Sequence, residues 1–135
     1  MNYFSYIFPL TVYKVSSVYN RDIRVEEESG RYKLLVNGAR ESGEYIKKLW
    51  EYAIKKLEIS KKRNVKRILV LGVAGGTIIH LLHAMYPKAK ITGVDIDSVM
   101  IEIGKKYFGL RDMKNVTLIV ADAKDFILHR KNNIY

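Results

Sequence analysis

The chain has 135 residues, a formal net charge of +10 and no cysteine. This length suits one hydrophobic core, and the lack of thiols excludes disulfides and thiolate metal centres, so we expect a cytoplasmic protein. The charge would suit nucleic acid, but it is spread evenly: residues 1–64 hold 13 basic and 8 acidic side chains, and residues 65–135 hold 11 and 6. Because neither part forms a basic tail, nucleic acid is the less favoured partner.

Residues 1–42 predict a small N-terminal β segment. Residues 3–18 are rich in aromatic and β-branched side chains, but they include Pro9 and Lys14 and are too short to span a membrane. Alternation of apolar and polar residues predicts three strands, the last two joined as a hairpin: residues 7–15, 23–27 and 32–36. A turn at 37–38 follows.

Residues 43–58 predict an amphipathic helix. Lysines and glutamates fill one face, and apolar side chains recur at helical spacing on the other: Ile46, Leu49, Trp50, Ala53, Ile54 and Leu57. Ser42 is the expected N-cap. We expect the helix to pack through Trp50 on the elements that follow.

Residues 43–135 predict half of an α/β nucleoside-binding domain. The apolar run 67–71 ends at Gly72, which is typical of a strand buried on both faces of a parallel sheet. Further elements alternate: helix 75–86, strand 90–94, helix 98–107, strand 116–120 and helix 123–128. Two successive β-α-β crossovers predict a Rossmann-like, doubly wound parallel sheet, incomplete because only three of its strands are present in the sequence.

A glycine turn, Gly72-Val73-Ala74-Gly75-Gly76, joins the first of these strands to the next helix. Such a turn lets a ligand approach the backbone, and the helix start offers N–H groups to an anion. Ala74 and Thr77 occupy positions where a dinucleotide fingerprint needs glycine, and the turn lacks the lysine of a P-loop. The alternative is that the glycines serve only tight packing.

Acidic residues end the next two strands. Asp95 follows the glycines by about twenty residues, where an acid accepts hydrogen bonds from ribose hydroxyls. Asp97 is the expected N-cap of the next helix. Asp122 lies at the same carboxyl edge and suits an adenine amino group, although helix capping explains it equally well. His80 and His83 share a helix face without a third ligand, so we expect no metal.

These residues resemble a known family. The segments 67–77, 93–97, 107–110 and 121–123 are similar, in this order, to the spermidine/spermine synthase-like branch of the class I S-adenosylmethionine-dependent methyltransferase superfamily. The resemblance implies a transferase that binds S-adenosylmethionine or its decarboxylated relative as co-substrate. The residues that it places around this ligand are Gly72, Val73, Ala74, Gly75, Gly76, Asp95, Ile96, Asp122 and Ala123.

The resemblance also identifies what the chain lacks. In that family an Asp-rich motif after the fourth strand binds and deprotonates the amine that receives the aminopropyl group. This chain ends at residues 132–135, where the fourth strand would begin, so its catalytic residues are unknown. We expect a fragment of a longer enzyme, or a homo-oligomer that pairs through the apolar edge at residues 68–71.

Two departures from the family leave the reaction open. Ala74 replaces an acid within the glycine turn, and Glu41 stands where the synthases usually have glutamine. Spermidine synthase-like aminopropyl transfer to a small-molecule amine is therefore one prediction. Methyl transfer to another acceptor is the second, and a catalytically silent nucleoside-binding or assembly module is the third.

Overall fold

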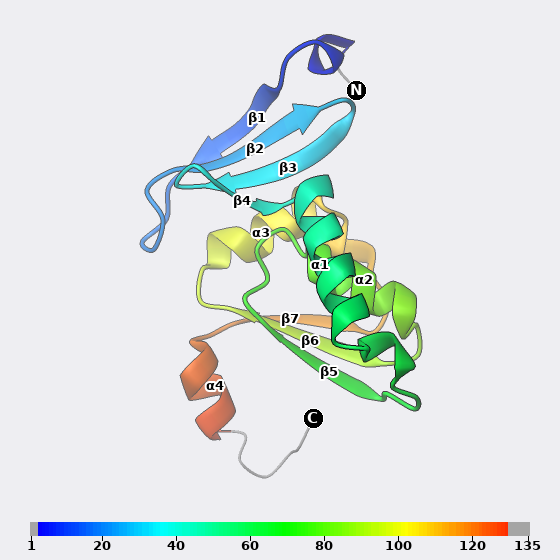
Figure 1. Cartoon of the computed structure of the whole chain (residues 1–135). Helices are drawn as coiled ribbons and strands as arrows, with labels where there is room; N and C mark the ends of the chain where they lie inside the picture. Colours follow the sequence, from blue (N-terminus) through cyan, green and yellow to red (C-terminus); the bar gives the residue numbers. More distant parts are fainter. Residues whose placement is uncertain (1–2, 130–135) are drawn as a thin grey trace.

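The computed structural model describes residues 3–129, which form two sheets (Figure 1). The first is antiparallel, in the order β1 (Leu10–Val15), β2 (Ile23–Glu28), β3 (Arg31–Val36) and β4 (Ala39–Ser42). A 3-10 helix, η1 (Tyr3–Tyr6), precedes it, so β1 begins after Pro9 and not at residue 7 as predicted. Proline has no N–H for a strand ladder, which suits this start. The hairpin and the turn at 37–38 are confirmed, whereas β4 was not predicted.

Helix α1 (Glu44–Lys56) follows the first sheet. Its predicted cap is wrong: Gly43 occupies the N-cap position, and no side chain caps the helix. Ser42 is instead buried and bonds elsewhere. The predicted packing through Trp50 is partial, because Trp50 and Leu57 remain 42% and 69% exposed while Ile54 is buried.

The second sheet is parallel, in the order β5-β6-β7. Its elements are β5 (Arg67–Leu71), α2 (Thr77–Met85), β6 (Lys90–Asp95), α3 (Ser98–Tyr107), β7 (Val116–Val120) and α4 (Ala123–His129), with η2 (Ile59–Lys61) and η3 (Leu110–Asp112) as short 3-10 turns. Figure 1 shows α1, α2 and α3 on one face of this sheet and α4 on the other. The predicted Rossmann-like α/β fold with a preceding β segment is confirmed.

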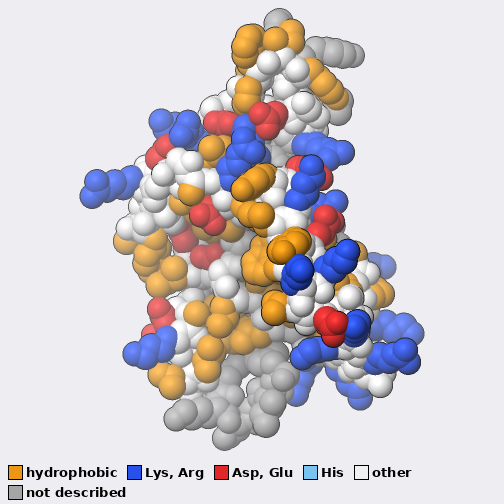
Figure 2. Space-filling view, in the orientation of Figure 1, with side chains coloured by type: hydrophobic (Ala, Val, Ile, Leu, Met, Phe, Trp, Pro, Cys, Tyr) orange, Lys and Arg blue, Asp and Glu red, His pale blue; other side chains and the backbone are white. Residues whose placement is uncertain are grey.

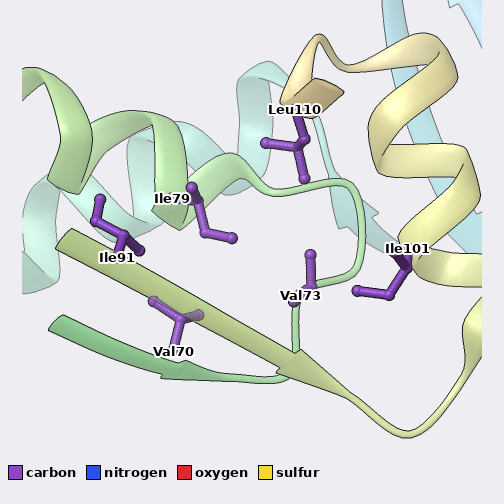
Figure 3. Close-up of a cluster of buried hydrophobic side chains, with 6 residues drawn as sticks. All are labelled: Val70, Val73, Ile79, Ile91, Ile101 and Leu110. Atoms are coloured by element: carbon purple, nitrogen blue, oxygen red, sulfur yellow. The ribbon is translucent and has the colours of Figure 1, made fainter. Parts of the chain in front are cut away.

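The core of the parallel sheet lies between its strands and the helices α2 and α3. Figure 3 shows the six buried side chains that meet there: Val70, Val73, Ile79, Ile91, Ile101 and Leu110. Val73 belongs to the glycine turn, so packing of its side chain fixes the turn against the sheet. No helix within residues 3–129 is long and apolar enough to cross a membrane.

The antiparallel sheet packs on α3. Ile23, Val25 and Leu34 are fully buried against Met100 and Ile103 of that helix. Burial of five large apolar side chains contributes on the order of 10 kcal/mol, at about 2 kcal/mol for each. Helix α3 therefore packs against both sheets and connects them.

Strand β5 is more exposed than predicted. Among the described residues it pairs only with β6, and Val70 is its one buried side chain, while Leu71 is 45% exposed. The expectation that this strand is buried on both faces is therefore wrong for residues 3–129. The expected apolar edge is present.

Candidate functional site

Three residues of the glycine turn, which follows β5, have a left-handed backbone conformation. Gly72, Ala74 and Gly76 have φ values of +85°, +47° and +83°. The Gly72 N–H donates to the carbonyl of Val94 at 2.8 Å, which ties the turn to β6. A left-handed conformation is costly for residues with a side chain, so Ala74 requires support from its surroundings.

Asp95, the last residue of β6, supplies that support. Its Oδ2 accepts hydrogen bonds from the N–H groups of Val73 at 2.8 Å and Ala74 at 3.1 Å, and its Oδ1 accepts one from Asp97 at 2.9 Å. A carboxylate has about four acceptor positions, so capacity remains for a ligand hydroxyl. The acid predicted to bind ribose therefore also holds the turn in place.

The three glycines of the turn differ in their surroundings. A Cβ at Gly75 would lie 2.7 Å from Ser42, and one at Gly76 would lie 2.6 Å from Leu110, so both positions require glycine for packing. A Cβ at Gly72 would meet no atom within 4 Å. Gly72 alone of the three faces open space.

The N–H groups of the two glycines just before α2 are already bonded. Gly75 donates to Oγ of Ser42 at 2.8 Å, and Gly76 donates to the carbonyl of Val73 at 2.8 Å. The prediction that this helix start offers free N–H groups to an anion is therefore wrong for these two residues. Gly75 and Gly76 therefore have no N–H group left to donate to a ligand.

A cavity of about 280 Å³ opens at the carboxyl edge of the sheet beside Gly72. Its walls come from both sheets and from α3: Asn20, Val36, Glu41, Gly72, Ala74, Asp95 and Met100. Two of the seven are carboxylates and none is basic. The predicted Gly72, Ala74 and Asp95 are thus brought together, whereas Gly75 and Gly76 are buried and do not line the cavity.

The wall from the antiparallel sheet is anchored by Asp97. This carboxylate is 3% exposed, caps α3 by accepting from the N–H of Val99 at 3.0 Å, and accepts from Asn20 Nδ2 at 3.0 Å. The hydroxyl of Ser17 donates to the same Oδ2. The predicted capping role is confirmed, and the same side chain also positions Asn20 at the cavity.

The remaining predicted residues lie at the end of β7 and beside it. The Ala121 N–H donates to the carbonyl of Asp95 at 3.0 Å, which places the two strand ends together. Asp122 accepts from the N–H groups of Lys124 at 2.8 Å and Asp125 at 3.0 Å, so it caps α4. Ile96 is 40% exposed next to Asp95. Neither Ile96, Asp122 nor Ala123 lines the cavity itself.

The two histidines of α2 bond to backbone carbonyls. Nε2 of His80 lies 2.6 Å from the carbonyl oxygen of Phe108, and Nε2 of His83 lies 3.0 Å from that of Lys114. Residues 3–129 contain no group of three or more metal-ligating side chains. Both histidines therefore connect α2 to the segment after α3 through backbone hydrogen bonds.

Sequence patterns missed part of the cavity. Asn20, Val36 and Met100 come from a loop, an antiparallel strand and a helix, and no local motif marks them. Glu41 stood out only through the family resemblance. Contacts across two sheets join residues that are far apart along the chain, so spacing alone does not reveal them.

A parallel sheet with a glycine turn after one strand and an acid at the end of the next defines a class of protein, the nucleoside-binding folds of the methyltransferase type. Residues 68–133 match a family model described as a methyltransferase domain. The chain has this methyltransferase-class fold together with a resemblance to spermidine synthases.

Curated relatives of two kinds share part of the sequence. The eEF1A lysine and N-terminal methyltransferase homolog of Drosophila melanogaster is 39% identical over 72 residues, which cover 53% of this chain and 11% of that protein. The polyamine aminopropyltransferase of Vibrio vulnificus is 32% identical over 62 residues, which cover 46% of this chain and 21% of that protein. The chain thus corresponds to a minor part of either relative's length.

Solved structures support the fold. A spermidine synthase in complex with the transition-state analogue AdoDATO superposes with a TM-score of 0.69 at 17% identity, covering 87% of this chain and 43% of the synthase. Human methyltransferase-like protein 13 in complex with SAH superposes with a TM-score of 0.50 at 26% identity, covering 58% and 39%. Because the synthase match covers 87% of the chain, it extends into residues 1–42.

Proposed function

We propose that this chain binds S-adenosylmethionine in the cavity beside Gly72 and serves a transferase that passes on the methyl group of this co-substrate. The observation that carries the proposal is the convergence of Gly72, Ala74 and Asp95 on one cavity at the carboxyl edge of a parallel sheet. Methyl transfer is favoured by the 39% identity with a methyltransferase homolog over 72 residues.

The residues fit an adenosyl sulfonium. Gly72 leaves open space for the ligand, and Asp95 retains acceptor capacity for a ribose hydroxyl. The side chain of Ile96 and the exposed carboxylate of Asp122 lie beside the Asp95 strand end, where adenine would stack on one and donate its amino group to the other. Glu41 would face the positively charged sulfonium side chain, because it is the second carboxylate of the cavity.

The chemistry of the bound ligand is displacement at carbon. An acceptor atom forms a bond to the methyl carbon while the carbon–sulfur bond breaks, and the acceptor's proton passes to solvent or a base. S-adenosylhomocysteine leaves. The described residues bind and orient the sulfonium for this in-line attack, which is how such sites gain most of their rate.

Aminopropyl transfer from decarboxylated S-adenosylmethionine is the second candidate. Two carboxylates and no basic side chain line the cavity, and this favours a ligand without its own carboxylate. The 32% identity with a polyamine aminopropyltransferase points the same way. An amine acceptor would then attack the aminopropyl carbon next to sulfur, and methylthioadenosine would leave.

Calorimetric titration tests the proposal. S-adenosylmethionine, its decarboxylated form and methylthioadenosine are titrated into the chain and into an Asp95→Asn variant, with Asp112→Asn, an exposed carboxylate in η3, as the matched control. We expect saturable binding that weakens about tenfold or more in Asp95→Asn alone, since hydrogen bonds to a charged group contribute roughly 1.5–3 kcal/mol. A preference for the decarboxylated ligand would favour aminopropyl transfer, and absence of binding to folded protein would leave only the assembly module.

A further inference from the structure

The amino ends of the parallel strands gather basic side chains that are dispersed in the sequence. Parallel strands begin at one edge of their sheet, and the register pairs Arg67 with Lys90 on adjacent strands. The Lys90 N–H donates to the carbonyl of Lys66 at 2.9 Å, and the Ile91 N–H donates to that of Asn115 at 2.8 Å. Three connections thus converge into a surface that we term the basic edge: Lys61, Lys62, Arg63, Lys66, Arg67, Lys88, Lys90 and Lys114.

All eight side chains of the basic edge are exposed. Figure 2 shows Lys and Arg side chains collected at the lower right of the molecule, where Figure 1 draws the end of α1, η2 and the start of β5. The even split of charge between the two parts of the sequence therefore hides a local concentration. Folding, and not composition, creates it.

Carboxylates compensate little of this charge. Residues 57–67 contain one acid, Glu58, which pairs with Lys61, and residues 86–91 contain none. Six members of the basic edge form no ion pair with a carboxylate of residues 3–129: Lys62, Arg63, Lys66, Lys88, Lys90 and Lys114. Like charges on neighbouring strands repel, so a bound polyanion would relieve a cost already present in the fold.

The composition of the basic edge favours nucleic acid over a protein partner. Lysine is depleted from protein–protein interfaces, which depend on buried aromatic and apolar anchors. Phosphate backbones are instead bound by exposed Lys and Arg side chains in contacts that carry no sequence information. The eight exposed Lys and Arg side chains of this surface supply such charge.

The basic edge and the cavity lie at opposite ends of the same strands. A strand of five residues, such as β5, separates them by roughly 16 Å at 3.3 Å per residue. Occupying one site therefore leaves the other accessible. Binding at the basic edge therefore does not depend on the proposed function of the cavity.

We propose that the basic edge binds the phosphate backbone of a nucleic acid without reading its bases. About three or four phosphates match the row formed by Lys62, Lys66 and Lys90 with their neighbours. Binding should then depend steeply on salt, with log Kd rising about 2 to 3 units for each tenfold increase in salt with a single strand.

Fluorescence anisotropy with a labelled 20-nucleotide single-stranded RNA tests this. The variant Lys62→Glu/Lys66→Glu/Lys90→Glu is compared with Arg21→Glu/Lys48→Glu/Lys124→Glu, which changes the net charge equally at exposed positions away from the basic edge. We expect wild-type binding with the stated salt dependence, at least tenfold weakening in the first variant and less than threefold in the second. Circular dichroism confirms folding of both, and glutamine versions of both triplets replace any variant that unfolds.

Three results would overturn the proposal. Equal weakening in both triple variants would mean that net charge alone attracts RNA. Equally tight binding of a polyglutamate peptide of matched charge would mean that the surface takes any polyanion, an acidic protein segment included. Absence of RNA binding at 50 mM salt would refute it directly, whatever the outcome of the S-adenosylmethionine titration.

Discussion

The N–H of Gly75 donates a hydrogen bond to Oγ of Ser42 at 2.8 Å, and this contact joins the end of the antiparallel sheet to the glycine turn. Ser42 is 2% exposed, and its own hydroxyl donates a hydrogen bond to the carbonyl of Glu41 at 2.8 Å. One buried hydroxyl therefore links the antiparallel sheet to the turn that follows β5. Its position explains why Gly75 needs to be glycine, since any Cβ there would overlap Ser42.

Replacing Ser42 by alanine should destabilise the fold. The Gly75 N–H would remain buried without its partner, which costs about 1–3 kcal/mol in free energy of unfolding. Urea denaturation measures the loss, and the exposed Ser60→Ala is the control, with an expected change below about 0.5 kcal/mol. Equal stability of the two variants would show that water or another group satisfies Gly75.

Gly72→Ala should separate binding from stability. Gly72 and Gly38 have φ values of +85° and +84°, and a Cβ at either would meet no atom within 4 Å. Alanine at each position should therefore cost a similar amount, about 1–2 kcal/mol for a left-handed conformation. Thermal unfolding checks this expectation.

The two glycine variants should differ in ligand affinity. Gly72 lines the cavity and Gly38 lies in the β3–β4 turn, so only Gly72→Ala places a methyl group where the ligand would sit. We expect Gly72→Ala alone to weaken S-adenosylmethionine binding in calorimetry. Unchanged affinity in that variant would show that the ligand does not bind against Gly72.

Glu41→Gln tests which part of the ligand Glu41 faces. Glu41 is exposed at the cavity, so its attraction for a ligand ammonium should contribute about 0.2–1 kcal/mol, which is up to about fivefold in affinity. Both S-adenosylmethionine and its decarboxylated form carry that ammonium, and methylthioadenosine lacks it. We expect weaker binding of the first two and no change for the third. A loss shared by all three would place Glu41 at the nucleoside.

The apolar edge of β5 should support self-association. Leu71 is 45% exposed at this edge, and unpaired strand edges with apolar side chains pair with other chains. We expect light scattering to detect species larger than a monomer and Leu71→Lys to shift them towards monomer. Val120→Lys, which adds the same charge at the exposed end of β7, is the control. A wild-type protein that stays monomeric at all concentrations would contradict this expectation.

Local sequence signals predicted most of the α/β part. Helix α3 and strand β7 have the predicted boundaries, because Asp97 caps the helix and β-branched residues fill the strand. Helix α2 begins at Thr77, two residues later than expected. The cause is Gly76, whose left-handed conformation ends the turn and cannot be part of a helix.

The predictions that failed concern contacts between distant segments. Ser42 has the local features of an N-cap, yet its hydroxyl is used by Gly75 in another part of the chain. Strand β4 lacks an apolar pattern, because its polar residues Arg40 and Ser42 pair with Leu35 and Leu34 of β3. Asn20 reaches the cavity only because Asp97 holds it there. Such relationships depend on tertiary structure and have no counterpart in residue spacing.

The walls of the cavity belong to both sheets, and this arrangement couples ligand affinity to how the sheets dock. A ligand bound between Asn20 and Glu41 on one side and Gly72 and Asp95 on the other would contact both sheets at once. By linkage it would stabilise the docked arrangement by RT ln(1 + [L]/Kd), about 2.7 kcal/mol when the ligand is at a hundred times its Kd. Hydrogen exchange at the Ile103 amide, which lies in the contact between α3 and the antiparallel sheet and not in the cavity wall, would then slow upon saturation.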